Sequence, residues 1–108
     1  VTFGIAAFGI SGLESALPLA LELVRDEVIT PSRMVEFMST NPAKIIGVAG
    51  GTLAAGSPAD ITLINPEDPH EITPSEWASK GRNTPFVGRE VPGRAVKTII
   101  DGRVAFSR

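Results

Sequence analysis

The chain has 108 residues, which corresponds to one domain at most. A chain of this length is expected to bury about two thirds of its unfolded surface and leave about 6,000 Å² exposed, so a core can form without disulfides. It contains no Cys and a single His, His70. Disulfides and thiolate sites are excluded. An ordinary zinc site cannot form from these residues alone, because catalytic zinc usually takes three ligands drawn mostly from His and Cys.

The net charge of −2 gives no overall basic field, so no nucleic-acid partner is expected. Residues 80–108 nevertheless carry seven basic and two acidic side chains, a local charge of +5. We interpret this segment as a solvated strand surface whose charges oppose edge pairing, and docking of an acidic partner is the alternative.

The longest apolar run, residues 5–10, is interrupted by Gly9 and is far too short to span a bilayer, so no membrane partner is expected. The absence of Cys points to a reducing compartment. The chain starts with Val1 rather than Met, and no basic region precedes a cleavage site. We therefore expect Val1 to be an internal position of a longer polypeptide.

A first helix is predicted after the opening residues. Ser11-Gly12-Leu13-Glu14 has the spacing of a capping box, in which the Ser hydroxyl and the Glu carboxylate satisfy amide hydrogens at a helix start. An apolar stripe follows at helical spacing, formed by Leu13, Ala16, Leu17, Ala20, Leu21 and Val24. A narrow polar stripe lies opposite, formed by Glu14, Pro18, Glu22, Arg25 and Asp26. Such a helix is expected to pack against a layer, with Pro18 bending it around that layer.

Two shorter helices are predicted next. Thr30-Pro31 supplies an N-cap followed by Pro at the first helical position. The expected buried face of that helix is Met34, Val35, Phe37 and Met38. Asn41-Pro42 starts another helix over residues 42–46, which ends at Gly47 in the left-handed conformation.

After Gly50-Gly51 the pattern becomes extended. Residues 52–54 and 60–64 are predicted as short strands around a turn at 56–58. Residues 65–92 contain five prolines and are predicted to be a long loop, with a helical turn near residues 74–78. Within it the segment PEDPHE, residues 66–71, is typical of a solvated turn, so we expect no catalytic or metal-binding role for its His70.

Residues 94–100 and 103–106 flank Asp101-Gly102 and predict a hairpin with a type I′ turn. Helices followed by a few separated strands do not make a self-contained sheet. The strands are therefore expected to find partners elsewhere in a larger protein.

The opening segment places Gly9 and Gly12 just before the first predicted helix. Backbone amides there can approach a ligand closely, and the positive helix end favours an anion such as a carboxylate. The alternative is that both glycines provide turn geometry only.

Several motifs together resemble one enzyme family. Residues 7–19, AFGISGLESALPL, resemble the segment of dihydroorotases that follows their last metal-binding motif. Residues 39–47, STNPAKIIG, resemble the final barrel helices, and residues 51–61 resemble the return to the small β-domain of amidohydrolases. Residues 80–88, KGRNTPFVG, resemble the dihydroorotase branch in particular, and the hairpin with residues 102–104 is common to many amidohydrolases.

The resemblance implies an α/β fold, namely the C-terminal part of a (β/α)8 TIM barrel together with the C-terminal half of a small composite β-domain. Residues 1–49 would hold the end of the last barrel loop and the closing helices. Residues 50–108 would form the C-terminal part of the small β-domain, with the long loop 65–92 packing on the barrel. A complete barrel needs at least about 200 residues, so this chain can supply only its last segment.

The resemblance also implies a function for the intact protein, in the cytoplasm. That function is zinc-dependent, reversible cyclisation of N-carbamoyl-L-aspartate to L-dihydroorotate in pyrimidine biosynthesis. The zinc ligands and the catalytic Asp would lie upstream, so neither catalytic nor metal-binding residues are assigned in this chain. The implied partners are the small-molecule substrate, the remainder of the barrel, a second copy in a homodimer, and aspartate carbamoyltransferase.

Three alternatives stay open at this point. The protein can be an inactive relative that serves as a scaffold for aspartate carbamoyltransferase. It can be a related cyclic amidase, allantoinase or dihydropyrimidinase. The chain can also act alone as a small binding module, although its wide apolar helix face would then lack a cover.

The resemblance assigns substrate binding to Phe8 and Gly9, largely through their backbone, with the glycine allowing close approach to the pyrimidine ring or its carboxylate. The family usually has Pro before that Phe, where this chain has Ala7. The replacement removes a φ restraint but no hydrogen-bond donor, because Pro has none.

The remaining polar candidates are expected to be structural. Residues 83–86, Asn-Thr-Pro-Phe, would position the long loop on the barrel. Arg82 would form a surface ion pair, with an anion contact as the alternative. Glu14 would be the cap partner of Ser11, and Asp60 would fix the turn entering its strand.

Overall fold

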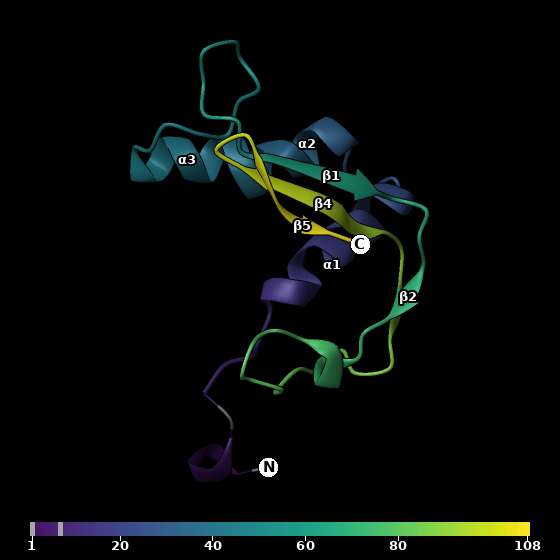
Figure 1. The fold of residues 1–108 in the computed structure, drawn as a ribbon. Helices are drawn as coiled ribbons and strands as arrows, with labels where there is room; N and C mark the ends of the chain where they lie inside the picture. The colour runs from purple at the N-terminus through teal and green to yellow at the C-terminus, as the bar shows by residue number, and fades with distance from the viewer. Residues whose placement is uncertain (1, 7) are drawn as a thin grey trace.

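The computed structural model describes residues 2–6 and 8–108, and most of its helices precede its strands along the chain (Figure 1). The helical segments are η1 Phe3–Ile5, α1 Leu13–Arg25, α2 Pro31–Val35, the π-helical turn η2 Glu36–Thr40, α3 Asn41–Ile46 and the 3-10 turn η3 Pro74–Glu76. The strands are β1 Ile61–Asn65, β2 His70–Glu71, β3 Glu90–Val91, β4 Arg94–Ile100 and β5 Arg103–Ser107.

Helix α1 begins one residue later than a capping box at Ser11 predicts, and that capping box does not form. Gly12 is its N-cap, and no side chain caps the helix. The Glu14 carboxylate instead accepts hydrogen bonds from Ser79, which is 65 positions away in sequence. The assignment of Glu14 as the cap partner of Ser11 is therefore wrong, because a long-range partner takes the carboxylate.

Burial on α1 follows its predicted stripes only in part: Leu21 of the apolar stripe is buried, but so are two residues of the polar stripe. Pro18 and Glu22 of the predicted polar stripe are buried, whereas Leu13 keeps 86% of its surface exposed. The C-terminal half of the chain packs on the polar side, where Arg89 forms an ion pair with Glu22. The outer part of the apolar stripe is left uncovered by the described residues.

The second and third predicted helices form one continuous helical path. Thr30 caps α2, and its Oγ1 accepts a hydrogen bond from the Arg33 N–H at 3.2 Å, as predicted. No new helix starts at Asn41-Pro42, because the preceding residue, Thr40, already has right-handed helical dihedrals. Pro42 has no N–H to donate within the helix; it lies in the first turn of α3, directly after the π-helical turn η2.

The end of this path agrees with the sequence, and its buried face does not. Gly47 ends α3 with φ of 73°, in the left-handed region that glycine adopts without strain. Of the four residues expected to be buried, only Met34 is; Val35, Phe37 and Met38 keep 42–48% of their surface exposed. That prediction is wrong for this chain because only one side of the helical path has a neighbour.

The main sheet is antiparallel, in the order β1-β4-β5. The hairpin is confirmed: Asp101 and Gly102 both have positive φ, 48° and 74°, as a type I′ turn requires. Asp60 Oδ1 accepts a hydrogen bond from the Asp101 N–H at 2.8 Å, so Asp60 fixes the turn of the neighbouring hairpin rather than the entry to its own strand. The predicted strand at 52–54 is wrong, since those residues form no ladder with the described residues.

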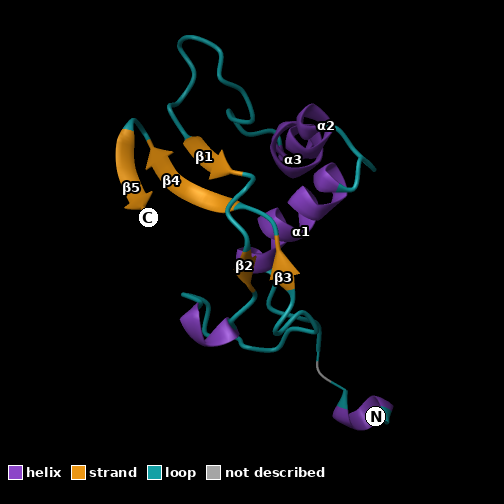
Figure 2. Cartoon of the chain, turned by 90° about the vertical axis from the view of Figure 1, so that its right-hand side faces the viewer, coloured by secondary structure: helices purple, strands orange, loops and turns teal. Residues whose placement is uncertain are grey.

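The long loop contains a second, two-stranded ladder, β2-β3. His70 therefore lies half-buried in a strand, and the prediction of a solvated turn through residue 70 is wrong. The helical turn predicted near residues 74–78 is confirmed as η3. In Figure 2 the three-stranded sheet lies to one side, α2 and α3 lie to the other, and the N-terminal turn η1 projects away from the rest.

The described residues form an open structure. The accessible surface is 7845 Å², against the value of about 6,000 Å² expected for a compact monomer of this mass. The radius of gyration is 15.7 Å, where about 13 Å is typical of a compact domain of this length. Buried apolar residues are few among those described: Leu21, Met34, Ala43, Ile72 and Val91. None of the described helices is long and apolar enough to cross a membrane.

Candidate functional site

The residues expected to contact substrate lie in the turn before α1. The Phe8 side chain is fully exposed. Gly9 has φ of 82°, a conformation that an L side chain adopts with strain, and among the described residues, its chain neighbours apart, no atom lies within 4 Å of where its Cβ would be. The backbone at Gly9 is thus open to approach from outside the chain. Ala7, where the family usually has Pro, lies outside the described residues.

Asn83 forms two hydrogen bonds with this turn, one as donor and one as acceptor. The Asn83 side-chain amide Nδ2 donates to the Gly9 carbonyl, and the Asn83 carbonyl accepts from the Ser11 N–H at 2.8 Å. The two bonds hold the backbone on both sides of Ile10. Residue 83 therefore touches the candidate binding turn directly.

Glu14 and Ser79 make a second anchor one helical turn further on. The Ser79 N–H and hydroxyl donate to the two Glu14 carboxylate oxygens at 2.8 and 2.9 Å. These bonds, the Ser79 backbone donor first, lower the pKa of Glu14 below its ordinary value of 4.5, and the Arg82 charge adds to the effect. The carboxylate is thus kept in the charged form that accepts both bonds.

We call residues 79–83, with these contacts to residues 9–14, the clamp. Gly81 lies so close to the turn that a Cβ there would collide with Ser11 Oγ. Arg82 donates to the Ser79 carbonyl and so shapes the clamp itself. Among the described residues no carboxylate forms the surface ion pair predicted for Arg82. The sequence singled out Asn83 and Glu14 but missed Ser79, since no local pattern marks a donor to a residue 65 positions away.

Two bidentate ion pairs fasten the rest of the C-terminal half. Arg89 binds the Glu22 carboxylate, with nitrogen–oxygen distances of 3.2 and 2.8 Å. Arg94 binds Asp68 at 2.6 and 2.9 Å, which lowers the pKa of Asp68 and raises that of Arg94. Two of the seven basic residues in segment 80–108 are therefore ion-paired with carboxylates of the described residues, and a third, Arg82, is hydrogen-bonded to a backbone carbonyl.

The residues present do not fit a zinc site. Within the described ranges, no group of three or more His, Cys, Asp or Glu side chains is placed to hold a metal ion. His70 has the Asp68 carbonyl oxygen 3.5 Å from its Nδ1. The described residues therefore do not form a metal site by themselves.

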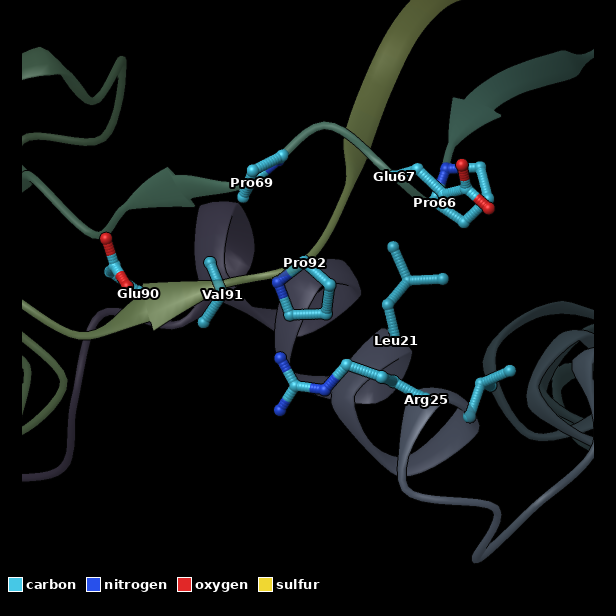
Figure 3. Close-up of a pocket in the computed structure, with 9 residues that line it drawn as sticks. Leu21, Arg25, Pro66, Glu67, Pro69, Glu90, Val91 and Pro92 are labelled. Carbon is cyan, nitrogen blue, oxygen red and sulfur yellow. The ribbon is translucent and has the colours of Figure 1, made fainter.

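A pocket of about 440 Å³ lies away from the binding turn (Figure 3). It opens between the C-terminal half of α1 and the proline-rich stretches around β2 and β3, with Leu21, Val91 and Pro92 among its apolar walls. Arg25, Glu67 and Glu90 supply its charged groups. Neither Phe8, Gly9 nor the clamp lines this pocket, so it is not part of the candidate site.

Comparison with known proteins assigns the family. Residues 5–105 match the model of the Amidohydrolase family. The chain belongs to the amidohydrolase family. It is 48% identical over 106 residues to a dihydroorotase of Syntrophus aciditrophicus and 51% identical over 108 residues to one of Pelobacter propionicus. These matches cover 98% and 100% of this chain but 25% and 26% of the relatives, so the chain spans about a quarter of their length.

Solved structures agree with this assignment. The L-hydantoinase (dihydropyrimidinase) of Arthrobacter aurescens is similar with a TM-score of 0.88 and 33% identity, over 94% of this chain and 23% of that one. A D-hydantoinase is similar with a TM-score of 0.81 and 29% identity, over 93% of this chain and 22% of that one. The α/β amidohydrolase fold and the resemblance to dihydroorotases are both confirmed.

Proposed function

We propose that this chain forms the C-terminal quarter of a zinc-dependent dihydroorotase, which interconverts N-carbamoyl-L-aspartate and L-dihydroorotate in the cytoplasm. The observation that carries the proposal is the identity of 42–51% with eight dihydroorotases across 98–100% of the chain. The hydantoinase structures are less similar in sequence, at 33% and 29%.

In this proposal the chain completes a (β/α)8 barrel whose other parts lie in polypeptide outside it. Residues 1–49 supply the last barrel loop and closing helices, and residues 50–108 supply half of the small β-domain. The uncovered apolar face of α1 supports this arrangement, because exposed large side chains such as Leu13 and Leu23 need a covering layer. The zinc is held entirely by residues outside this chain.

The role of this chain in the reaction is then to bind and orient substrate. Phe8 and Gly9 contact it through their backbone, and the open side of Gly9 admits the ring or its carboxylate closely. Fixed backbone groups cost no reorganisation when substrate binds, so a held loop favours a productive orientation. Proton transfer belongs to side chains beyond this chain.

The test is an assay of the complete protein that contains this chain. We expect measurable turnover of dihydroorotate and of carbamoyl aspartate, with bound zinc found by elemental analysis. Turnover of hydantoin, dihydrouracil or allantoin in preference to dihydroorotate would replace the proposal by a related cyclic amidase, which the hydantoinase structures make the second candidate. An inactive protein that co-purifies with aspartate carbamoyltransferase would identify a scaffold.

A further inference from the structure

Asn83 lies in the long loop, but its side chain binds the turn before α1, where the residues expected to contact substrate lie. Its side chain is exposed, so the hydrogen bond to the Gly9 carbonyl does little to build a core. The bond crosses 74 positions of sequence and ends on a residue assigned to substrate contact. Such a contact serves the geometry of the loop.

The consequence follows from peptide geometry. A trans peptide points its carbonyl and its N–H in opposite directions, and the described residues contain no cis peptide bond. Holding the Gly9 carbonyl therefore also fixes the direction of the Ile10 N–H. The bond from the Ser11 N–H to the Asn83 carbonyl fixes the next peptide plane in the same way.

Gly9 makes this restraint necessary. Glycine loses more conformational freedom on folding than any other residue, and a positive φ at an exposed turn is easily abandoned. Without Asn83, the backbone that meets substrate would sample several orientations, and only the fraction in the competent one would bind.

We propose that Asn83 is a positioning residue, whose side-chain amide holds the Gly9 carbonyl and so keeps the substrate-contacting backbone in its binding orientation. This inference rests on the proposed function. It assigns to the KGRNTPF segment a part in substrate affinity, in addition to docking the loop.

The test uses Asn83→Leu in the complete protein, since Leu has nearly the same shape and cannot donate. We expect KM for dihydroorotate to rise about 3- to 10-fold, because this factor corresponds to the net free energy of one hydrogen bond. The kcat per folded enzyme should be unchanged. Asn83→Gln keeps an amide donor at an exposed position, so its KM should lie closer to wild type. Asn65→Leu is the matched control, because it removes another exposed side-chain bond to backbone, from the Glu67 N–H, and should leave KM unchanged.

A second readout separates this inference from the proposed function. Amide hydrogen exchange of residues 9–12 should be faster in Asn83→Leu than in wild type and unchanged in Asn65→Leu. Unchanged KM, or unchanged exchange, in Asn83→Leu would overturn the inference, as would a loss explained only by a smaller folded fraction. A wild-type protein that fails to turn over dihydroorotate refutes the proposed function instead, whatever the exchange experiment gives.

Discussion

At the scale of single residues, the fold depends on places where two backbone segments pack closely together, and no local sequence pattern predicts these places. Gly93 has φ of 60°, and a Cβ there would lie 2.6 Å from both the Asn65 carbonyl oxygen and the Pro66 Cα. The same Cβ would lie 2.8 Å from Leu21 on α1. The absence of a side chain at Gly93 therefore allows the backbone just before β4 to pack directly on the end of β1 and on α1.

We expect Gly93→Ala to destabilise the complete protein by about 2–4 kcal/mol, because left-handed strain and an overlap with backbone atoms act together. Gly56→Ala is the control: Gly56 has φ of 87° but nothing within 4 Å of its Cβ position, so only the strain of about 1–2 kcal/mol applies. Urea unfolding of both variants measures the difference. Equal losses in the two variants would show that the close approach at Gly93 has no energetic weight.

At the scale of elements, the sequence predicted caps and turns that depend on neighbouring residues, but not the hydrogen bonds between residues far apart in the chain. The Thr30 cap, the left-handed Gly47 and the Asp101-Gly102 turn were predicted correctly, because each depends on residues only a few positions apart. The capping box failed because the Glu14 carboxylate accepts from Ser79 instead, while the Ser11 N–H donates to the Asn83 carbonyl. In the candidate site, Asn83 was found by resemblance, and its contact with Gly9 needed the structure.

The clamp carries a pH dependence with a defined sign. Since Ser79 lowers the pKa of Glu14 in the folded protein, the stabilisation is complete above the unfolded value of about 4.5. It is lost as pH falls through the lower folded pKa. We expect the NMR shift of the Ser79 amide to titrate with a midpoint below 4.5 while the protein is still folded, and Glu14→Gln to abolish that titration. A midpoint at or above 4.5 would contradict the clamp.

At the scale of the whole molecule, the described residues do not enclose a core of their own. Large apolar side chains are exposed on helices and sheet alike, for example Leu13, Ile45 and Phe106. The predicted buried face over Met34 to Met38 failed for this reason, since a helical pattern reports which side is apolar and not whether this chain covers it. The extra surface reflects contacts that the described residues do not make with one another, because these exposed side chains lie on formed helices and strands.

This openness predicts how residues 1–108 behave when expressed alone. We expect the isolated chain to bind a hydrophobic dye and to melt broadly, because its apolar faces lack their covering layer.

The substitution Leu13→Gln should have opposite effects on the isolated chain and on the complete protein. In the isolated chain it should reduce dye binding at little cost, since Leu13 is 86% exposed there. In the complete protein it should lower the melting temperature, because the same side chain is then buried. A sharp cooperative melt of the isolated chain, or a complete protein indifferent to Leu13→Gln, would contradict the proposal that a barrel covers this face.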